Sequence, residues 1–175
     1  MTDQFIDAYS DDQIFIHMLD NLIEQSATES GTPDYIKVSS CCRLAAVLAI
    51  GSIDSLVVHF SRVVPGCEDL ADFAKPNENR LKLKRLKEFL LASGITVEDD
   101  VLEDYLAVKY IRNAYVHSNW SEGQKAFVAS RGFPSDVMSF EGFHFERIKK
   151  THIELMNYVG MATALRDLLS TRVSV

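Results

Sequence analysis

The segment RLAAVLAIGSIDSLVVHF, residues 43–60, constrains the fold of this chain more than any other feature. It is apolar on most faces of a helix and lies between the polar Ser40 and the helix-breaking Pro65. A helix without a polar face must be surrounded by other helices, because a surface helix keeps one side for water. We therefore expect a central, deeply buried helix, with Gly51 as a soft point or a place of close helix approach.

The other segments also carry helical periodicity, with apolar residues recurring at three- and four-residue spacing. This spacing predicts helices over about 12–26, 79–93, 98–118 and 148–171, and a helical turn over 68–73. Asn77 or Asn79 is expected to cap the helix that starts near 79, and Gly94 is expected to end it.

Residues 119–145 show a weaker pattern, in which one part suits a short helix and VMSFEGFHF (137–145) alternates enough to allow a small hairpin. We find no internal repeat and no low-complexity tract. The sequence therefore predicts an all-α fold, an irregular bundle of about five helices. A single domain over residues 1–175 is expected, with an acidic helix and loop over 1–38 and the core over 39–171.

The chain carries 18 Lys and Arg against 25 Asp and Glu, a formal net charge of −7. This balance argues against non-specific attachment to duplex DNA or an anionic membrane, so any contact with nucleic acid must be local. The N-terminus lacks the cationic and apolar parts of a secretory signal, and the apolar stretches are too short for a membrane span. Cys41, Cys42 and Cys67 have no metal-binding spacing and predict reduced thiols. We expect a soluble, cytoplasmic protein.

Positive charge is concentrated on the predicted helix over 79–93. Two carboxylates, Glu78 and Glu88, stand against its five cations, Arg80, Lys82, Lys84, Arg85 and Lys87. Two interpretations stay open: a solvated face that favours solubility, or a surface that tracks phosphates.

One cluster carries candidate chemistry, YIRNAYVHSNW at residues 110–120, near the end of a long predicted helix. Arg112 points into an apolar sector of that helix, where a buried guanidinium is costly unless it is paired. Either a carboxylate meets it, Asp54 being one candidate, or the sector opens at a cleft or a subunit interface. Asn113 and His117 form an i,i+4 pair in which the amide can orient the imidazole. The side chain of Arg112 can also curve around the helix end toward His117.

These residue types suit phosphodiester chemistry. An arginine stabilises charge on a phosphorus-centred transition state, and a histidine moves a proton on the attacking or leaving oxygen. Ser118 and Asn119 should end the helix and leave the imidazole accessible. The alternative is structural: Arg112 pairs with a core carboxylate, and His117 only ends the helix.

No pattern for a metal or another cofactor accompanies this cluster. The chain has no P-loop, GxGxxG or GxSxG motif, and no histidine pair has HExxH spacing. The remaining histidines are expected to be structural, namely His17, His59, His144 and His152.

The segment IRNAYVHSNW resembles the signature of HEPN domains, in which a polar residue directly follows an Arg and a His comes after four to six residues that separate it from the Arg. Here Arg112 and His117 are separated by four residues and Asn113 fills the polar position. The layout resembles that family over roughly residues 39–170. The resemblance implies a metal-independent endoribonuclease, acting as a toxin or defence effector.

The resemblance also implies a homodimer in which the Arg and His of two subunits meet across a two-fold cleft, and a 2′-hydroxyl of the RNA that attacks the adjacent phosphate. Arg112 would then stabilise the transition state, His117 would transfer a proton and Asn113 would orient groups in the site. A cognate antitoxin or a nucleotidyltransferase would be the partner that silences the protein.

Residues near the motif are candidates for binding RNA. Lys109 lies one turn before Asn113, and Tyr115 and Trp120 can stack on an unpaired base. Some proteins similar to this family are not nucleases. The alternative function is therefore a non-catalytic interaction or regulatory module resembling the mannitol operon repressor, in which Arg112 and His117 are structural.

Overall fold

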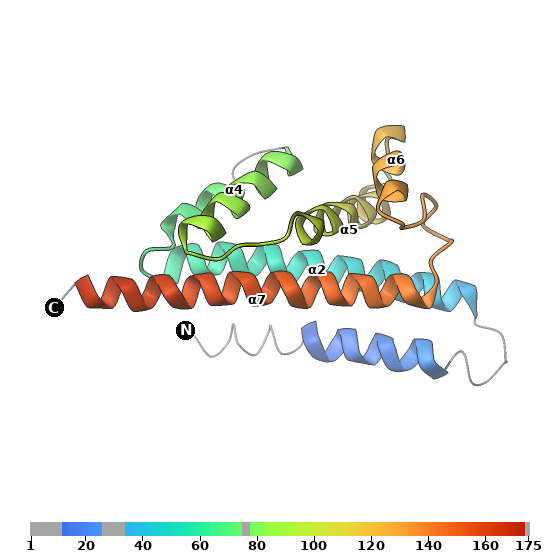
Figure 1. Cartoon of the computed structure of the whole chain (residues 1–175). Helices are drawn as coiled ribbons and strands as arrows, with labels where there is room; N and C mark the ends of the chain where they lie inside the picture. The colour runs from blue at the N-terminus through green and yellow to red at the C-terminus, as the bar shows by residue number, and fades with distance from the viewer. Residues whose placement is uncertain (1–11, 26–33, 75–77, 174–175) are drawn as a thin grey trace. The chain divides into compact units, whose positions relative to one another are not determined.

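The computed structural model describes residues 12–25, 34–74 and 78–173 (Figure 1). These residues are helical almost throughout and contain no strand, which confirms the all-α class. A helix over residues 12–25 comes first. The elements after it are α2 (Tyr35–Val63), the short 3-10 helix η1 (Glu68–Leu70), α3 (Ala71–Ala74), α4 (Asn79–Ala92), α5 (Asp99–His117), α6 (Glu122–Ser130) and α7 (Gly142–Val173).

Helix α2 contains the apolar segment and starts earlier than the sequence predicts. The side chain of Asp34 caps it, since its Oδ1 accepts hydrogen bonds from the backbone N–H groups of Ile36 (3.1 Å) and Lys37 (3.2 Å). Much of α2 is buried, as expected of a central helix. Gly51 is exposed and a Cβ there would meet no atom within 4 Å, so it marks no close helix approach.

Among the described helices, α2 is the one long and apolar enough to cross a membrane. More than half of its most apolar stretch is buried inside the protein. The core helix of a soluble protein has the same character, so a soluble protein is compatible with this helix.

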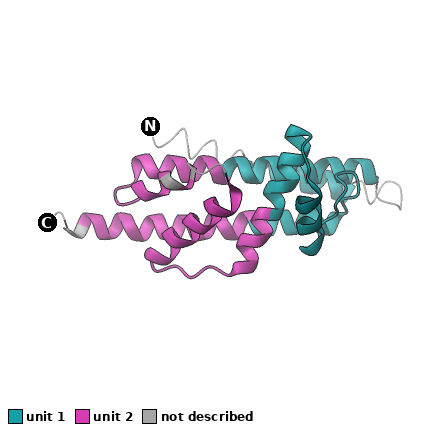
Figure 2. Cartoon of the chain, turned by 90° about the horizontal axis from the view of Figure 1, so that it is seen from above, with its two compact units in different colours: residues 1–52, 107–151 teal, residues 53–106, 152–175 magenta. Residues whose placement is uncertain are grey.

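The chain divides into two compact units (Figure 2). Unit 1 takes in residues 1–52 and 107–151, and unit 2 takes in residues 53–106 and 152–175. Helices α2, α5 and α7 therefore each contribute to both units.

Unit 1 buries the first part of α2 and the aromatic residues that precede and open α7. The segment before α7 lies against α2, because Ser39 Oγ donates to the carbonyl of Val137 (2.8 Å). The helix over residues 12–25 contacts α7 through an ion pair between Asp20 and Lys149. Fully buried large side chains here include Ile50, Ile111, Phe140, Phe145 and Ile148.

Unit 2 is built around the second part of α7. Arg166 on α7 donates to Ser93 Oγ (2.8 Å) and to the carbonyl of Gly66 (2.8 Å), and its guanidinium lies over the ring of Phe89. Fully buried large side chains here include Ile53, Leu70, Leu86, Leu90, Tyr105, Leu106 and Leu155.

Helix α4 ends at the predicted glycine, but its N-cap residue differs from the prediction. Gly94 has a φ of +81°, and the N–H of Ile95 donates to the carbonyl of Leu90 (2.9 Å), which closes the helix. At the start, Glu78 occupies the N-cap position without a side-chain hydrogen bond, and Asn79 is already helical. The prediction of Asn79 as the cap is therefore wrong, and Asn77 lies outside the described residues.

The predicted hairpin within residues 119–145 is wrong as well. Residues 122–130 form α6, which Ser121 and Gln124 start through a capping box. Residues 137–145 form a turn followed by the start of α7, instead of two strands. The carboxylate of Asp136 holds the turn by accepting hydrogen bonds from Met138 N–H (3.1 Å) and Ser139 Oγ (2.9 Å).

Candidate functional site

The candidate catalytic residues lie together at the C-terminal end of α5, in unit 1. Helix α5 ends at His117, and Ser118 adopts a left-handed conformation with a φ of 51°. A left-handed residue cannot continue a right-handed helix, so Ser118 stops α5. The expectation that Ser118 ends the helix beside an accessible imidazole is confirmed, since His117 is exposed.

The guanidinium of Arg112 joins the three predicted side chains. Its Nη1 donates to Asn113 Oδ1 at 2.9 Å and lies 3.2 Å from His117 Nε2. The prediction that Arg112 curves toward His117 is therefore confirmed. The predicted direct pairing of the Asn113 amide with the imidazole is not what the geometry shows, because the longer arginine side chain reaches between the two.

The contact between Arg112 and His117 suits one tautomer of the imidazole. A guanidinium has only donors, so a hydrogen bond between these two atoms requires His117 Nε2 to accept, with the ring proton on Nδ1. In that tautomer the Nε2 lone pair is directed toward the guanidinium. A neutral imidazole next to a fixed positive charge is the arrangement in which a histidine can accept a proton from a substrate bound to the arginine.

Arg112 is half-buried and has no carboxylate partner among the residues of unit 1 that the structure describes. Its Nε is buried without a hydrogen-bond partner among the described residues. The carboxylate of Asp54, the partner that the sequence suggested, accepts a hydrogen bond from the hydroxyl of Tyr105 (2.9 Å) within unit 2. A cation held by neutral acceptors keeps its charge available to an anion.

Comparisons with protein-family models, curated proteins and solved structures found no match to this chain.

The three residues predicted to bind RNA differ in their accessibility. Tyr115 is 48% exposed, whereas Lys109 is only 6% exposed and so presents little of its side chain to solvent. Trp120 is half-buried, and its Nε1 is buried without a hydrogen-bond partner among the described residues. Of the three, Tyr115 offers the most open surface for a base.

Sequence reasoning missed Arg43, which belongs to the same unit. Its guanidinium lies over the ring of Tyr115, 5.2 Å from the ring centroid. The sequence does contain a hint, because Arg43 is the one Lys or Arg between Lys37 and Arg62. Like Arg112, it is a cation next to apolar residues. However, Arg43 stands at the start of the apolar segment and does not interrupt it, so the helical pattern does not single it out.

The described residues offer neither a metal site nor a reactive thiol beside this cluster. The part of the chain that the structure describes holds no group of three or more His, Cys, Asp and Glu side chains that could bind a metal ion. All three cysteines are free, as predicted, and the structure also shows that they are buried. Burial raises the pKa of Cys42 to about 12 and that of Cys67 to about 11, so neither supplies a thiolate near neutral pH.

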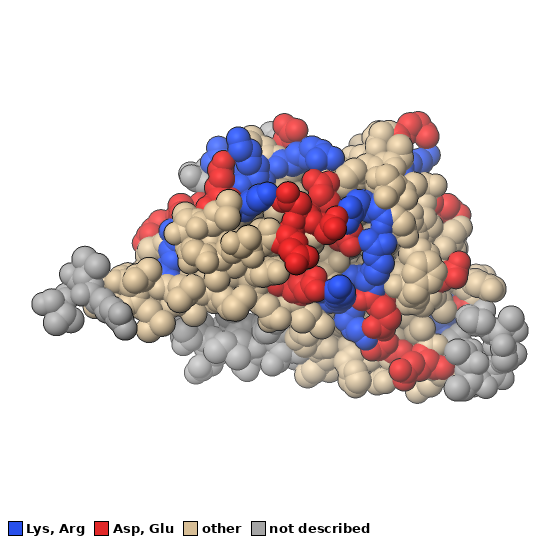
Figure 3. Space-filling model, in the orientation of Figure 1, with Lys and Arg blue, Asp and Glu red and all other residues tan. Residues whose placement is uncertain are grey.

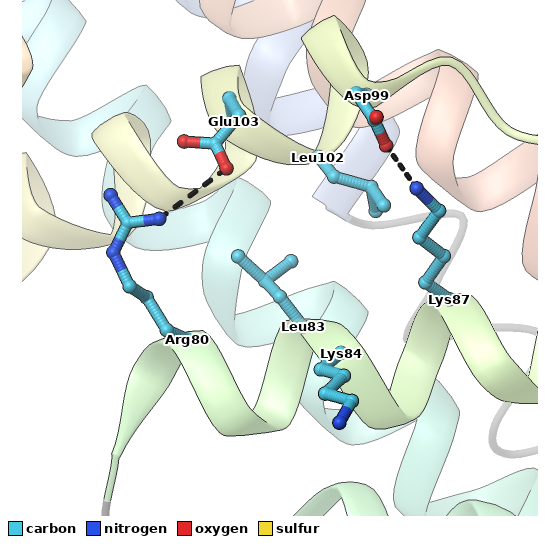
Figure 4. A pocket seen from close by; sticks show the side chains of 7 residues that line it. All are labelled: Arg80, Leu83, Lys84, Lys87, Asp99, Leu102 and Glu103. Carbon is cyan, nitrogen blue, oxygen red and sulfur yellow. Dashed lines mark hydrogen bonds and ion pairs between the residues drawn. The ribbon is translucent and has the colours of Figure 1, made fainter.

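The cationic helix α4 borders an open groove in unit 2, with a volume of about 270 Å³ (Figure 4). Leu83 and Leu102 lie on its floor. Lys and Arg side chains gather over α4 on the face drawn in Figure 3, with Asp and Glu side chains next to them.

Carboxylates neutralise much of this groove. Arg80 pairs with Glu103 at 3.5 Å and Lys87 pairs with Asp99, while Lys84 lies 3.9 Å from Glu88 on α4 itself. A phosphate-tracking surface needs cations that no carboxylate has already engaged. The pairing therefore favours the solvated, ion-paired interpretation of α4.

Proposed function

We propose that this protein is a metal-independent endoribonuclease of HEPN type, which cleaves single-stranded RNA as a homodimer. The observation that carries the proposal is the contact of 3.2 Å between Arg112 Nη1 and His117 Nε2, at an exposed helix end and with no carboxylate on the guanidinium among the described residues of its unit. The resemblance of the RN-x3-H segment to the HEPN signature supports the same chemistry.

The side chains suit an attack by the neighbouring 2′-hydroxyl. The 2′-oxygen forms a bond to phosphorus while the bond from phosphorus to the 5′-oxygen breaks, which yields a 2′,3′-cyclic phosphate and a 5′-hydroxyl. His117 Nε2 accepts the proton of the 2′-hydroxyl, and the imidazolium of the second subunit returns a proton to the 5′-oxygen. Arg112 stabilises the charge that develops on the phosphoryl oxygens.

Asn113 holds the guanidinium in place during this reaction. Because its Oδ1 accepts from the same Nη1 that contacts His117, it restrains a long side chain that would otherwise sample several rotamers. The neutral amide does this without lowering the positive charge that the phosphate needs, as a carboxylate would.

The homodimer in the proposal follows from the resemblance to HEPN domains, in which the Arg and His of two subunits meet across a two-fold cleft. Val116, which directly precedes His117, is about half exposed and offers an apolar side chain for such a contact. The proposal includes a toxin or defence role in which a cognate partner protein silences the nuclease.

The test is cleavage of a single-stranded RNA by the purified protein in EDTA. Wild-type protein should cleave, and His117→Ala and Arg112→Ala should each lower the rate by at least about a hundredfold. His17→Ala is the matched control, because His17 is an exposed histidine in the helix over residues 12–25.

The control variant should cleave at the wild-type rate. Cleavage that depends on an added metal ion, or that persists in the His117→Ala protein, would contradict the proposal. Folded wild-type protein that leaves RNA intact would favour the non-catalytic, regulatory alternative.

A further inference from the structure

Arg43 is held in one direction by several contacts from its surroundings in unit 1. Its Nε donates to the carbonyl of Ser39 (3.2 Å), and its Nη2 donates to Ser40 Oγ (2.9 Å). Its Nη1 lies 3.0 Å from the sulfur of Met138, in the segment that precedes α7. A surface arginine with this many contacts has already lost the conformational freedom that binding a ligand would otherwise cost.

These contacts leave donors available on the guanidinium. An arginine has five N–H donors, and the contacts above engage one on each nitrogen, so each Nη keeps one N–H without a partner among the described residues. No described carboxylate forms an ion pair with Arg43. A thioether is a weak acceptor, so an anion can displace Met138 at little cost.

One acidic side chain that senses the charge of Arg43, that of Asp136, is already engaged by other donors. The carboxylate of Asp136 accepts from Met138 N–H and Ser139 Oγ, and these two hydrogen bonds account for most of the lowering of its pKa. The positive charge of Arg43 lowers that pKa a little further. Asp136 therefore feels the guanidinium through space but does not bind it.

Tyr115 links Arg43 to the candidate catalytic residues. Its ring lies under the guanidinium of Arg43, 5.2 Å from the ring centroid to Cζ, and about half of the residue stays exposed. In the sequence of α5, Tyr115 lies three residues after Arg112 and two before His117. Residues three apart are neighbours on a helix surface, so Tyr115 adjoins Arg112.

We propose that Arg43 and Tyr115 form a nucleotide subsite for single-stranded RNA, in which Tyr115 stacks on an unpaired base and Arg43 binds the phosphate of the same nucleotide. Stacking on an aromatic ring suits single-stranded RNA, whose bases are not covered by a helix. The guanidinium supplies a planar donor pair that matches phosphate geometry. The location next to the cleaved bond rests on the proposed function, whereas binding itself does not.

The experiment measures binding of a fluorescently labelled oligouridylate by anisotropy, in the His117→Ala background so that the RNA stays intact. Arg43→Gln and Tyr115→Leu should each weaken binding by about tenfold, whereas Tyr115→Phe should stay within about twofold because it keeps the ring. Arg43→Gln should also lower the slope of log affinity against log salt by about 0.7, the effect of one lost phosphate contact on a single strand.

Arg62→Gln is the matched control, since Arg62 is an exposed arginine in the last turn of the same helix α2. It removes the same charge and should leave affinity within about twofold of the parent. Arg43→Lys should restore the salt slope but not the full affinity, because lysine keeps the charge and loses the planar fork.

The inference is overturned if Arg43→Gln binds as tightly as Arg62→Gln, or if Tyr115→Leu binds as tightly as Tyr115→Phe. Cleavage by wild-type protein together with either result would remove the subsite and leave the proposed function standing. Binding that depends on Arg43 and Tyr115, together with intact RNA after incubation with wild-type protein, would remove the nuclease function and leave the subsite standing.

Discussion

At the scale of single residues, the guanidinium of Arg112 decides the geometry of the site. Helical spacing alone predicts that Arg112, Asn113 and His117 lie near one helix end, and the structure brings all three together. Helical spacing does not show which side chains form hydrogen bonds with one another. It places only the Cβ atoms around the helix, and the guanidinium of an arginine lies far from its Cβ. The same reach explains why Arg43 was missed, since its contact with Tyr115 joins two helices that are distant in sequence.

Asn113 is predicted to position the guanidinium. Asn113→Ala should lower the cleavage rate by about ten- to a hundredfold, because Arg112 loses the acceptor that restrains Nη1. Stability should fall by only about 1 kcal/mol, the net worth of one hydrogen bond. Asn113→Asp should lower cleavage further, since a carboxylate neutralises the guanidinium, and steady-state kinetics with urea unfolding separates the two effects. Asn113→Ala cleaving at the wild-type rate would contradict this role.

We expect the free energy of unfolding to depend on pH because of the buried His152. It is 1% exposed in α7, and burial lowers its pKa to about 4, against about 6.5 in an unfolded chain. Below pH 6.5 the unfolded chain gains a proton on this histidine that the folded protein does not, so stability falls as the pH drops from 6.5 to 4 and this contribution then levels off. The loss is about 3 kcal/mol.

Urea unfolding of wild-type protein and of His152→Gln at pH 7 and pH 4 measures this contribution. The wild-type protein should lose more free energy of unfolding between the two pH values than the variant does. His144 adds a loss of the same sign in both proteins, since burial lowers its pKa as well. Equal losses in wild type and variant would show that His152 does not titrate as described.

At the scale of elements, periodicity in the sequence predicted the long helices, because their buried faces repeat at helical spacing. It placed the start of α2 too late, since the first residues of that helix, Tyr35 and Ile36, are exposed and only the Asp34 cap marks the boundary. It also suggested a hairpin in 137–145, where a turn is followed directly by the first residues of α7. Short alternating runs do not separate these two cases.

Two glycines predict opposite effects of adding a methyl group. Gly51 is exposed within α2 and a Cβ there meets no atom within 4 Å, so Gly51→Ala should stabilise the protein by roughly 0.5–1 kcal/mol. Gly94 has equally open surroundings but a φ of +81°, so Gly94→Ala should destabilise it by about 1 kcal/mol. Thermal or urea unfolding measures both, and a Gly94→Ala protein as stable as wild type would contradict the role of Gly94 in ending α4.

At the scale of the whole molecule, the all-α class followed from composition and periodicity, but the division into two compact units did not. Apolar faces show which sides of a helix are buried and leave open which helices pack together. Three helices contribute to both units, so no boundary in the sequence marks where one unit ends. The net charge of −7 describes the chain as a whole. The candidate site rests on Arg112 and Arg43, two cations that form no ion pair with a described carboxylate of their own unit.

The most direct test of the central claim is the chemistry of the RNA ends that the protein produces in EDTA. Mass spectrometry of the fragments should show 2′,3′-cyclic phosphate and 5′-hydroxyl ends with wild-type protein. The His117→Ala protein, folded as shown by its circular dichroism spectrum, should produce no such fragments. Fragments with 3′-hydroxyl and 5′-phosphate ends, or the same cyclic phosphate ends from His117→Ala, would contradict the account.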